Sequence, residues 1–160
     1  MTSADAFTTR STFRADHPAA LALYCSDGRY TQAVEELLKH LGHARLDTLT
    51  LPGGPGLLSM GSAAFVELDA TKRGASFLIA GHGIRDVFLI AHDGCGYYRS
   101  RNPRKEAAAI ARIQREDLRA AAGALEAAHR QLATHLYYAR PHAGHVTFDP
   151  VARTPEPFGP

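Results

Sequence analysis

Apolar and polar residues follow one another along this chain in blocks that predict alternating strands and helices. Residues 86–92 (DVFLIAH) contain an uninterrupted apolar run, which is typical of a buried strand, and residues 21–25 (LALYC) contain a shorter one. Residues 46–51 (LDTLTL) alternate with the period of a half-buried strand, whereas the apolar residues of 30–41 are spaced as on one face of a helix. The other predicted elements are a helix over 63–84 that could break at 72–74, an alanine-rich helix over 104–135, and short strands over 136–139 and 146–148.

The order of these elements predicts the fold class. Strands that alternate with helices of this length indicate an α/β fold, with a mostly parallel central sheet of four to five strands flanked by helices. A chain of 160 residues has room for one such domain, which we expect over residues 20–150. We expect residues 1–19 to form a polar N-terminal arm and residues 151–160 to form an extended, proline-rich tail.

Composition and charge exclude several classes of protein. A content of 45% hydrophobic and 21% charged residues excludes a disordered chain, and a net charge of +2 is too small to indicate a nucleic-acid partner. No apolar run has the ~18 residues of a membrane span, and the first residues lack the apolar core of a secretory signal. We therefore expect a cytoplasmic protein with no nucleic-acid or membrane partner, whose two cysteines are free thiols or metal ligands.

Candidate chemistry lies where two of the predicted strands end. Cys25 ends the first strand, and the third strand ends at His92 and continues through a tight turn to Cys95. The carboxyl ends of parallel strands share one edge of a sheet, so these side chains converge if the two strands are adjacent. Two thiolates and one imidazole suit a catalytic zinc ion with an open fourth position. Either half of the pattern alone is more often an ordinary buried residue, but together they use both cysteines of the chain, which favours a metal site.

Two charged residues follow Cys25 closely. Asp27 and Arg29 are two positions apart, so in an extended segment their side chains can point the same way. A carboxylate held by a guanidinium stays ionised and keeps a fixed orientation. Asp27 is therefore either an acceptor that orients a metal-bound hydroxide or a fourth ligand that closes the site.

These motifs resemble those of a known family. The motif C-x-D-x-R at residues 25–29, followed by H-x-x-C-G at residues 92–96, resembles the signature of the β-class carbonic anhydrases. Residues 82–90 (HGIRDVFLI) are similar to the family's helix end, glycine turn and third strand. The resemblance covers roughly residues 21–96, and the paired motifs are its specific part.

The resemblance implies a function and a set of roles. Cys25, His92 and Cys95 would hold one Zn²⁺ per chain, and Asp27 and Arg29 would form the catalytic dyad. The implied activity is that of a zinc-dependent lyase, the reversible hydration of carbon dioxide to bicarbonate by a zinc-bound hydroxide. The family also implies a homodimer or a higher even oligomer, with the site at the subunit interface.

The sequence departs from the family pattern at two places. Residues 51–55 (LPGGP) stand where the family typically has a polar Arg-Asn-Ala-Gly-Asn-like loop, and Tyr97 and Tyr98 follow Gly96 where small residues are common. These tyrosines could crowd or reshape the substrate pocket. The alternatives are therefore a zinc-binding relative that acts on another small electrophile, such as CS₂ or COS, and a non-catalytic zinc scaffold or regulatory protein.

Other interpretations of the same segments fit less well. A thiol phosphatase needs five residues between its cysteine and arginine, whereas three residues separate Cys25 from Arg29, and Asp27 would repel a phosphate. Residues 52–56 (PGGPG) lack the lysine of a phosphate-binding loop and predict a wide turn. The basic run over 99–105 is expected to be a solvated loop, with anion or nucleic-acid contact as the alternative.

Overall fold

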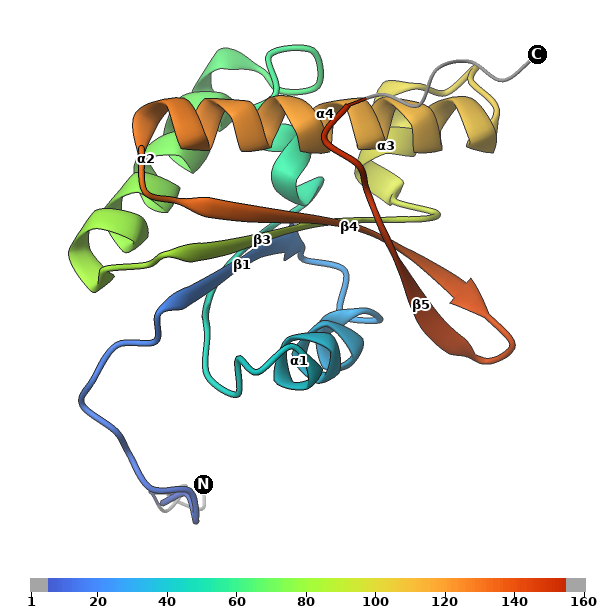
Figure 1. Ribbon diagram of the computed structural model, residues 1–160. Coiled ribbons are helices and arrows are strands. Elements are labelled where there is room, and N and C mark those ends of the chain that lie inside the picture. The colour runs from blue at the N-terminus through green and yellow to red at the C-terminus, as the bar shows by residue number, and fades with distance from the viewer. Residues whose placement is uncertain (1–5, 155–160) are drawn as a thin grey trace, which may run out of the picture.

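The computed structural model describes residues 6–154, in which a five-stranded sheet carries helices on both faces (Figure 1). The strand order is β2-β1-β3-β4-β5, in which the first four strands are parallel and β5 runs antiparallel to β4. The predicted α/β class and mostly parallel sheet are therefore confirmed. The strands are β1 (Ala20–Cys25), β2 (Asp47–Leu51), β3 (Asp86–His92), β4 (Ala133–His142) and β5 (His145–Pro150).

The two central strands, β1 and β3, are covered on both faces, which explains their unbroken apolar sequences. Successive side chains of a strand point to opposite faces. In β3, Leu89 packs in the cluster formed with α2 (Phe65–His82) and α4 (Ala107–Ala128). Its neighbour Phe88 packs in the cluster formed with α1 (Thr31–His40) on the other face. Figure 1 shows this arrangement, with α1 on one side of the sheet and α2 and α4 on the other.

The long C-terminal helix is shorter than its composition predicts. Helix α4 ends at Ala128, and His129 leaves helical geometry with φ −135° and ψ 88°. Strand β4 then begins at Ala133, which pairs with Asp86 of β3. The prediction of helix as far as residue 135 is wrong because backbone pairing with β3 outweighs the local helix propensity.

The glycine-rich segment after β2 forms a buried 3₁₀ turn, η1 (Gly54–Leu58), rather than the wide turn that was predicted. Gly53 and Gly54 have φ values of 91° and 52°, which glycine adopts without strain. A Cβ atom on Gly54 would lie 2.6 Å from the backbone nitrogen of Cys25, and one on Gly53 would lie 2.5 Å from the ring of Tyr97. Gly54 therefore lets this turn pack directly against the end of β1, and Gly53 lets it pack against Tyr97.

Two further differences concern the helices. Helix α2 continues unbroken through residues 72–74, where the sequence allowed a break. A short helix that was not predicted, α3 (Gly96–Arg101), contains the first part of the basic run. The basic side chains of this run are exposed, as expected for solvated residues: Arg99, Arg101, Arg104 and Lys105.

The segments outside the sheet domain contain little regular structure. Residues 6–19 form no helix or strand, and their ordered contacts include Arg45 with Asp16 and a stack of His17 on His82 with ring centroids 3.8 Å apart. Residues 1–5 of the predicted arm and 155–160 of the predicted tail lie outside the described residues. Within residues 6–154, no helix is long and apolar enough to cross a membrane.

The contact between η1 and β1 leads to a stability prediction. We expect Gly54→Ala to destabilise the fold by about 1–2 kcal/mol through left-handed backbone strain and by a further ~1–3 kcal/mol through overlap with the β1 backbone. Gly83→Ala is the matched control, because Gly83 has φ 69° but its Cβ would meet no atom within 4 Å. Urea unfolding of both variants measures the difference, and equal losses of stability would contradict the proposed close packing.

Candidate metal centre

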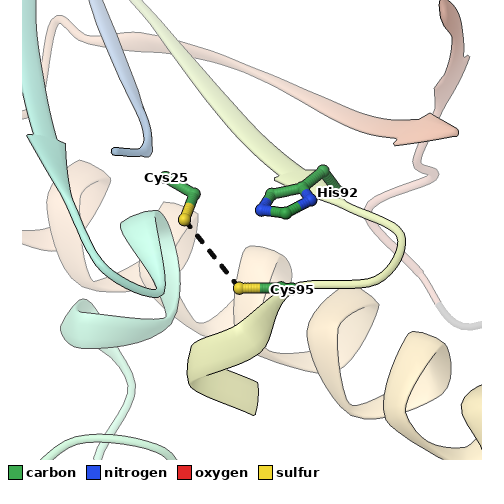
Figure 2. Close-up of side chains that lie close together, drawn as sticks. All are labelled: Cys25, His92 and Cys95. Carbon is green, nitrogen blue, oxygen red and sulfur yellow. Dashed lines mark hydrogen bonds between the residues drawn. The ribbon is translucent and has the colours of Figure 1, made fainter. Parts of the chain in front are cut away.

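The pairing of β1 with β3 brings three metal-binding side chains together. Cys25 ends β1, His92 ends β3, and Cys95 lies directly before α3. The two sulfur atoms are 3.9 Å apart, and the ligand atoms of all three residues lie within 4.8 Å of one another (Figure 2). The convergence predicted from the two strand ends is therefore present, in a buried group of residues that could hold a metal ion.

In the imidazole of His92, one nitrogen forms a hydrogen bond and the other has no hydrogen-bond partner among the described residues. Its Nδ1 lies 2.8 Å from the carbonyl oxygen of Asp93, to which it donates a hydrogen bond. Among the described residues, Nε2 is a buried nitrogen with no hydrogen-bond partner, and Figure 2 shows a ring nitrogen turned toward the sulfurs. A buried polar atom without a partner is costly. A metal ion between Nε2 and the two sulfurs would remove that cost.

The donor set and its spacing fit zinc. Two Zn–S bonds of about 2.3 Å at a tetrahedral angle place their sulfurs roughly 3.8 Å apart. The observed distance between Cys25 Sγ and Cys95 Sγ is 3.9 Å, and the side chains of both residues are buried. Two thiolates with one imidazole leave one position of a tetrahedral zinc ion open, which is the arrangement of catalytic sites.

The two thiols influence each other's ionisation. The hydrogen bond from Cys95 lowers the pKa of the Cys25 thiol, against the opposing effect of burial. The same hydrogen bond, together with burial, raises the pKa of the Cys95 thiol. One thiolate is therefore favoured before any metal binds, and a divalent cation would stabilise the second.

Asp27 and Arg29 form a tight ion pair beside this group. The guanidinium Nη2 lies 2.6 Å from Asp27 Oδ2, Nε lies 3.0 Å from Oδ1, and the Arg29 backbone N–H also donates to Oδ1 at 3.1 Å. These hydrogen bonds hold the pKa of Asp27 at about 2, although partial burial opposes the shift. The carboxylate is therefore ionised at neutral pH. It is occupied by Arg29 and does not belong to the cluster of three close ligand atoms.

Tyr97 and Tyr98 turn their hydroxyl groups away from the cysteines. The Tyr98 ring packs in a buried cluster with both cysteines, but its hydroxyl donates to Asp117 of α4 at 2.7 Å. The Tyr97 hydroxyl donates to the carbonyl oxygen of Ser62 at 2.8 Å. Burial, followed by the neighbouring Asp117 carboxylate, raises the pKa of Tyr98, so this hydroxyl remains a donor. The two tyrosines thus form one wall of the site and bind neighbouring elements.

Sequence reasoning missed two residues that contact the turn over residues 92–95, which carries two of the candidate ligands. The Tyr30 hydroxyl donates to the carbonyl oxygen of Asp93 at 3.1 Å, and the Gln114 side-chain amide donates to the carbonyl oxygen of His92 at 2.8 Å. Gln114 had a sequence signal, because it lies between Ile110 and Leu118 at helical spacing, as one polar residue on an apolar face. Tyr30 had no comparable signal, because its partner is a backbone atom more than sixty residues away.

Comparisons with solved structures identify the fold. The chain is similar to β-carbonic anhydrase isoform I from Trichomonas vaginalis, with TM-score 0.55 and 14% identity over 88% of this chain and 87% of that one. It is also similar to the β-carbonic anhydrase CafA of Aspergillus fumigatus, with TM-score 0.53 and 18% identity over 89% and 78% of the two chains. A tetrameric β-carbonic anhydrase from Sordaria macrospora gives TM-score 0.52 and 15% identity over 83% and 81%.

The fold of this chain is that of the β-carbonic anhydrases, as the resemblance of the sequence motifs implied. A scan against protein-family models and a search of curated proteins each give no match. At 12–18% identity, the structural likeness establishes the fold.

Proposed function

We propose that the chain binds one Zn²⁺ through Cys25, His92 and Cys95 and catalyses the reversible hydration of carbon dioxide to bicarbonate. The observation that carries the proposal is the buried, unpartnered Nε2 of His92 beside two sulfurs that are 3.9 Å apart. When bound, zinc supplies Lewis-acid activation of a water molecule, which becomes a nucleophile near neutral pH. The cytoplasm fits this site, because both cysteines are free and a reducing compartment keeps them so.

Asp27 has the properties needed to orient the attacking water. As an ionised carboxylate it can only accept hydrogen bonds, so a water molecule beside it must turn an O–H toward it and a lone pair elsewhere. Arg29 fixes the carboxylate through two nitrogen atoms, which removes the freedom of Asp27 to turn toward the metal ligands. The Arg29 side chain is 71% exposed, so the dyad lies where a small substrate can arrive from solvent.

A second candidate function rests on the turn that packs against Cys25. Gly54 approaches the Cys25 backbone closely, and the segment 52–56 supplies no polar side chain where the family typically has several. That difference favours a zinc protein that acts on another small electrophile, such as CS₂ or COS, or one that serves as a scaffold. Turnover of the zinc-loaded chain with each substrate separates these functions.

We also propose that the chain assembles as a homodimer or a higher even oligomer. Several large apolar side chains of the described residues are exposed on and near α2, and exposed apolar surface of this kind marks interaction sites. Their exposed fractions are 85% for Met60, 81% for Phe65, 76% for Val66 and 69% for Phe77. The Sordaria macrospora proteins of this fold are described as tetrameric, which supports the proposal.

The dyad leads to a kinetic prediction. In stopped-flow assays of the zinc-loaded chain, Asp27→Asn should lower the rate of CO₂ hydration by about 10²-fold without loss of zinc, because the amide cannot both accept from water and bind Arg29 equally well. Arg29→Ala should cost more, because Asp27 then becomes unpaired and free to reach the metal.

The matched control for these variants is Arg140→Ala. Arg140 and Asp149 form a similar ion pair, at 2.6 Å, on the antiparallel ribbon of β4 and β5. Loss of this ion pair should leave the rate of CO₂ hydration unchanged. If the zinc-loaded wild-type chain hydrates CO₂ no faster than free aqueous zinc between pH 6.5 and 9, the hydration proposal fails while the metal site stands.

The exposed face of α2 leads to a prediction about assembly. Light scattering should give a mass of two chains or an even multiple, where one chain is 17.3 kDa. Phe65→Glu combined with Phe77→Glu should shift the protein toward single chains, whereas Lys39→Glu, at an exposed position of α1 on the other side of the sheet, should not. A mass of one chain for the wild-type protein would contradict the proposed assembly.

A further inference from the structure

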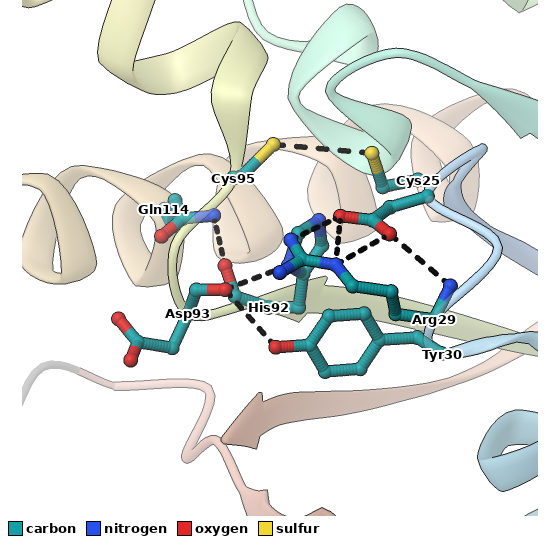
Figure 3. A network of polar contacts seen from close by, with 8 residues as sticks. Cys25, Arg29, Tyr30, His92, Asp93, Cys95 and Gln114 are labelled. Atoms are coloured by element: carbon teal, nitrogen blue, oxygen red, sulfur yellow. Dashed lines mark hydrogen bonds and ion pairs between the residues drawn. The ribbon is translucent and has the colours of Figure 1, made fainter. Parts of the chain in front are cut away.

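The turn that carries two of the three proposed ligands is held by groups from three different elements. The backbone N–H of Asp93 donates to the carbonyl oxygen of Ala139 in β4 at 2.8 Å. Tyr30, directly before α1, donates to the carbonyl oxygen of Asp93, and Gln114 of α4 donates to the carbonyl oxygen of His92 (Figure 3). Both carbonyl groups of the His92–Asp93 segment are therefore held by side chains that are distant in sequence.

Tyr30 contacts the His92 ring in two ways. Its hydroxyl shares the Asp93 carbonyl oxygen with His92 Nδ1, so this one oxygen accepts hydrogen bonds from both side chains. Its ring also packs against the imidazole, with ring centroids 4.3 Å apart. Tyr30 is buried, so the contact is shielded from competing water. The ring of Tyr30 thus restrains the plane of the imidazole. Its hydroxyl restrains the Asp93 carbonyl oxygen, whose hydrogen bond keeps the proton of His92 on Nδ1.

Gln114 is a buried amide that forms a hydrogen bond with the turn over residues 92–95. It is 2% exposed, and its Nε2 donates to the His92 carbonyl at 2.8 Å. Its Oε1 accepts from the Tyr138 hydroxyl at 3.3 Å, so both ends of the amide are satisfied. A buried amide costs free energy unless it is hydrogen-bonded, and leucine would pack at this position without that requirement. The position of Gln114 is therefore explained by the His92 carbonyl that it holds.

We propose that Tyr30 and Gln114 are positioning residues of the metal centre. Together they hold the carbonyls of Asp93 and His92 so that Nδ1 remains the donor and Nε2 is directed at the two sulfurs before a metal ion arrives. This inference rests on the zinc site of the proposed function and is independent of the reaction catalysed there. Partners that orient a ligating histidine typically account for about 10–100-fold in metal affinity.

Competition with a chromophoric chelator measures the zinc affinity of the full chain. We expect Tyr30→Phe to raise the zinc dissociation constant about 10-fold and Gln114→Leu to raise it about 10–100-fold. Thr71→Val is the matched control, because it removes a buried hydroxyl that donates to a backbone carbonyl oxygen at 2.7 Å, here that of Glu67 within α2. The control should bind zinc as the wild-type chain does. Tyr30→Phe keeps the test decisive if Gln114→Leu fails to fold.

A second readout reports on the His92 proton directly. In ¹⁵N-histidine NMR spectra of the zinc-loaded chain, the Nδ1 proton of His92 should exchange slowly with solvent, and Tyr30→Phe should accelerate that exchange. A role of Tyr30 in general stability alone would not change this signal in a fully folded variant.

The possible results separate this inference from the function on which it rests. Folded Tyr30→Phe and Gln114→Leu variants with wild-type zinc affinity would overturn the positioning roles and leave the metal site in place. Equal weakening in Thr71→Val would also overturn them, because the effect would then come from general stability. If the wild-type chain itself binds no zinc, the metal site fails and this inference fails with it.

Discussion

The parallel pairing of β1 with β3 is the interaction on which the proposed site depends. Its register sets Tyr24 opposite Ile90, so Cys25 and His92 emerge from neighbouring strands at the same edge of the sheet. A shift by one residue would send the side chains of β1 to the opposite face. Burial on both faces opposes such a shift, because Leu23 packs with α2 and α4 while Ala22 packs with α1. The core therefore fixes the register, and the register fixes how the three candidate ligands lie relative to one another.

Close packing around the end of β1 explains the glycines that follow β2. At Gly54 the turn η1 packs directly against the end of β1, where a Cβ atom would overlap the Cys25 backbone, and at Gly53 it packs against the ring of Tyr97. Tyr98 packs in the same buried cluster as both cysteines and is tied to α4 through Asp117. The two thiols are thereby enclosed, while the Asp27–Arg29 pair remains at the surface. A buried group of candidate metal ligands beside an accessible ion pair is the arrangement that the proposed reaction requires.

The parts of the fold that were predictable depend on local pattern. The strands over 86–92 and 21–25 were predictable because their sequences are apolar runs. Both strands end at residues that can bind a metal, so the convergence of Cys25, His92 and Cys95 followed from the geometry of a parallel sheet. The end of α4 was not predictable, because residues 133–135 join β4 through hydrogen bonds to β3 that their own sequence does not indicate. The role of Tyr30 was also not predictable, because its hydroxyl binds the backbone carbonyl of Asp93, which is distant in sequence.

The central claim is that Cys25, His92 and Cys95 bind one zinc ion and leave one position open. Metal analysis combined with X-ray absorption at the zinc edge tests it on the purified chain. The account predicts about one zinc per chain with two sulfur ligands, one imidazole nitrogen and one further light-atom ligand, and loss of most of the metal in Cys95→Ser. A zinc ion without sulfur ligands, or full zinc occupancy in Cys95→Ser, would contradict it.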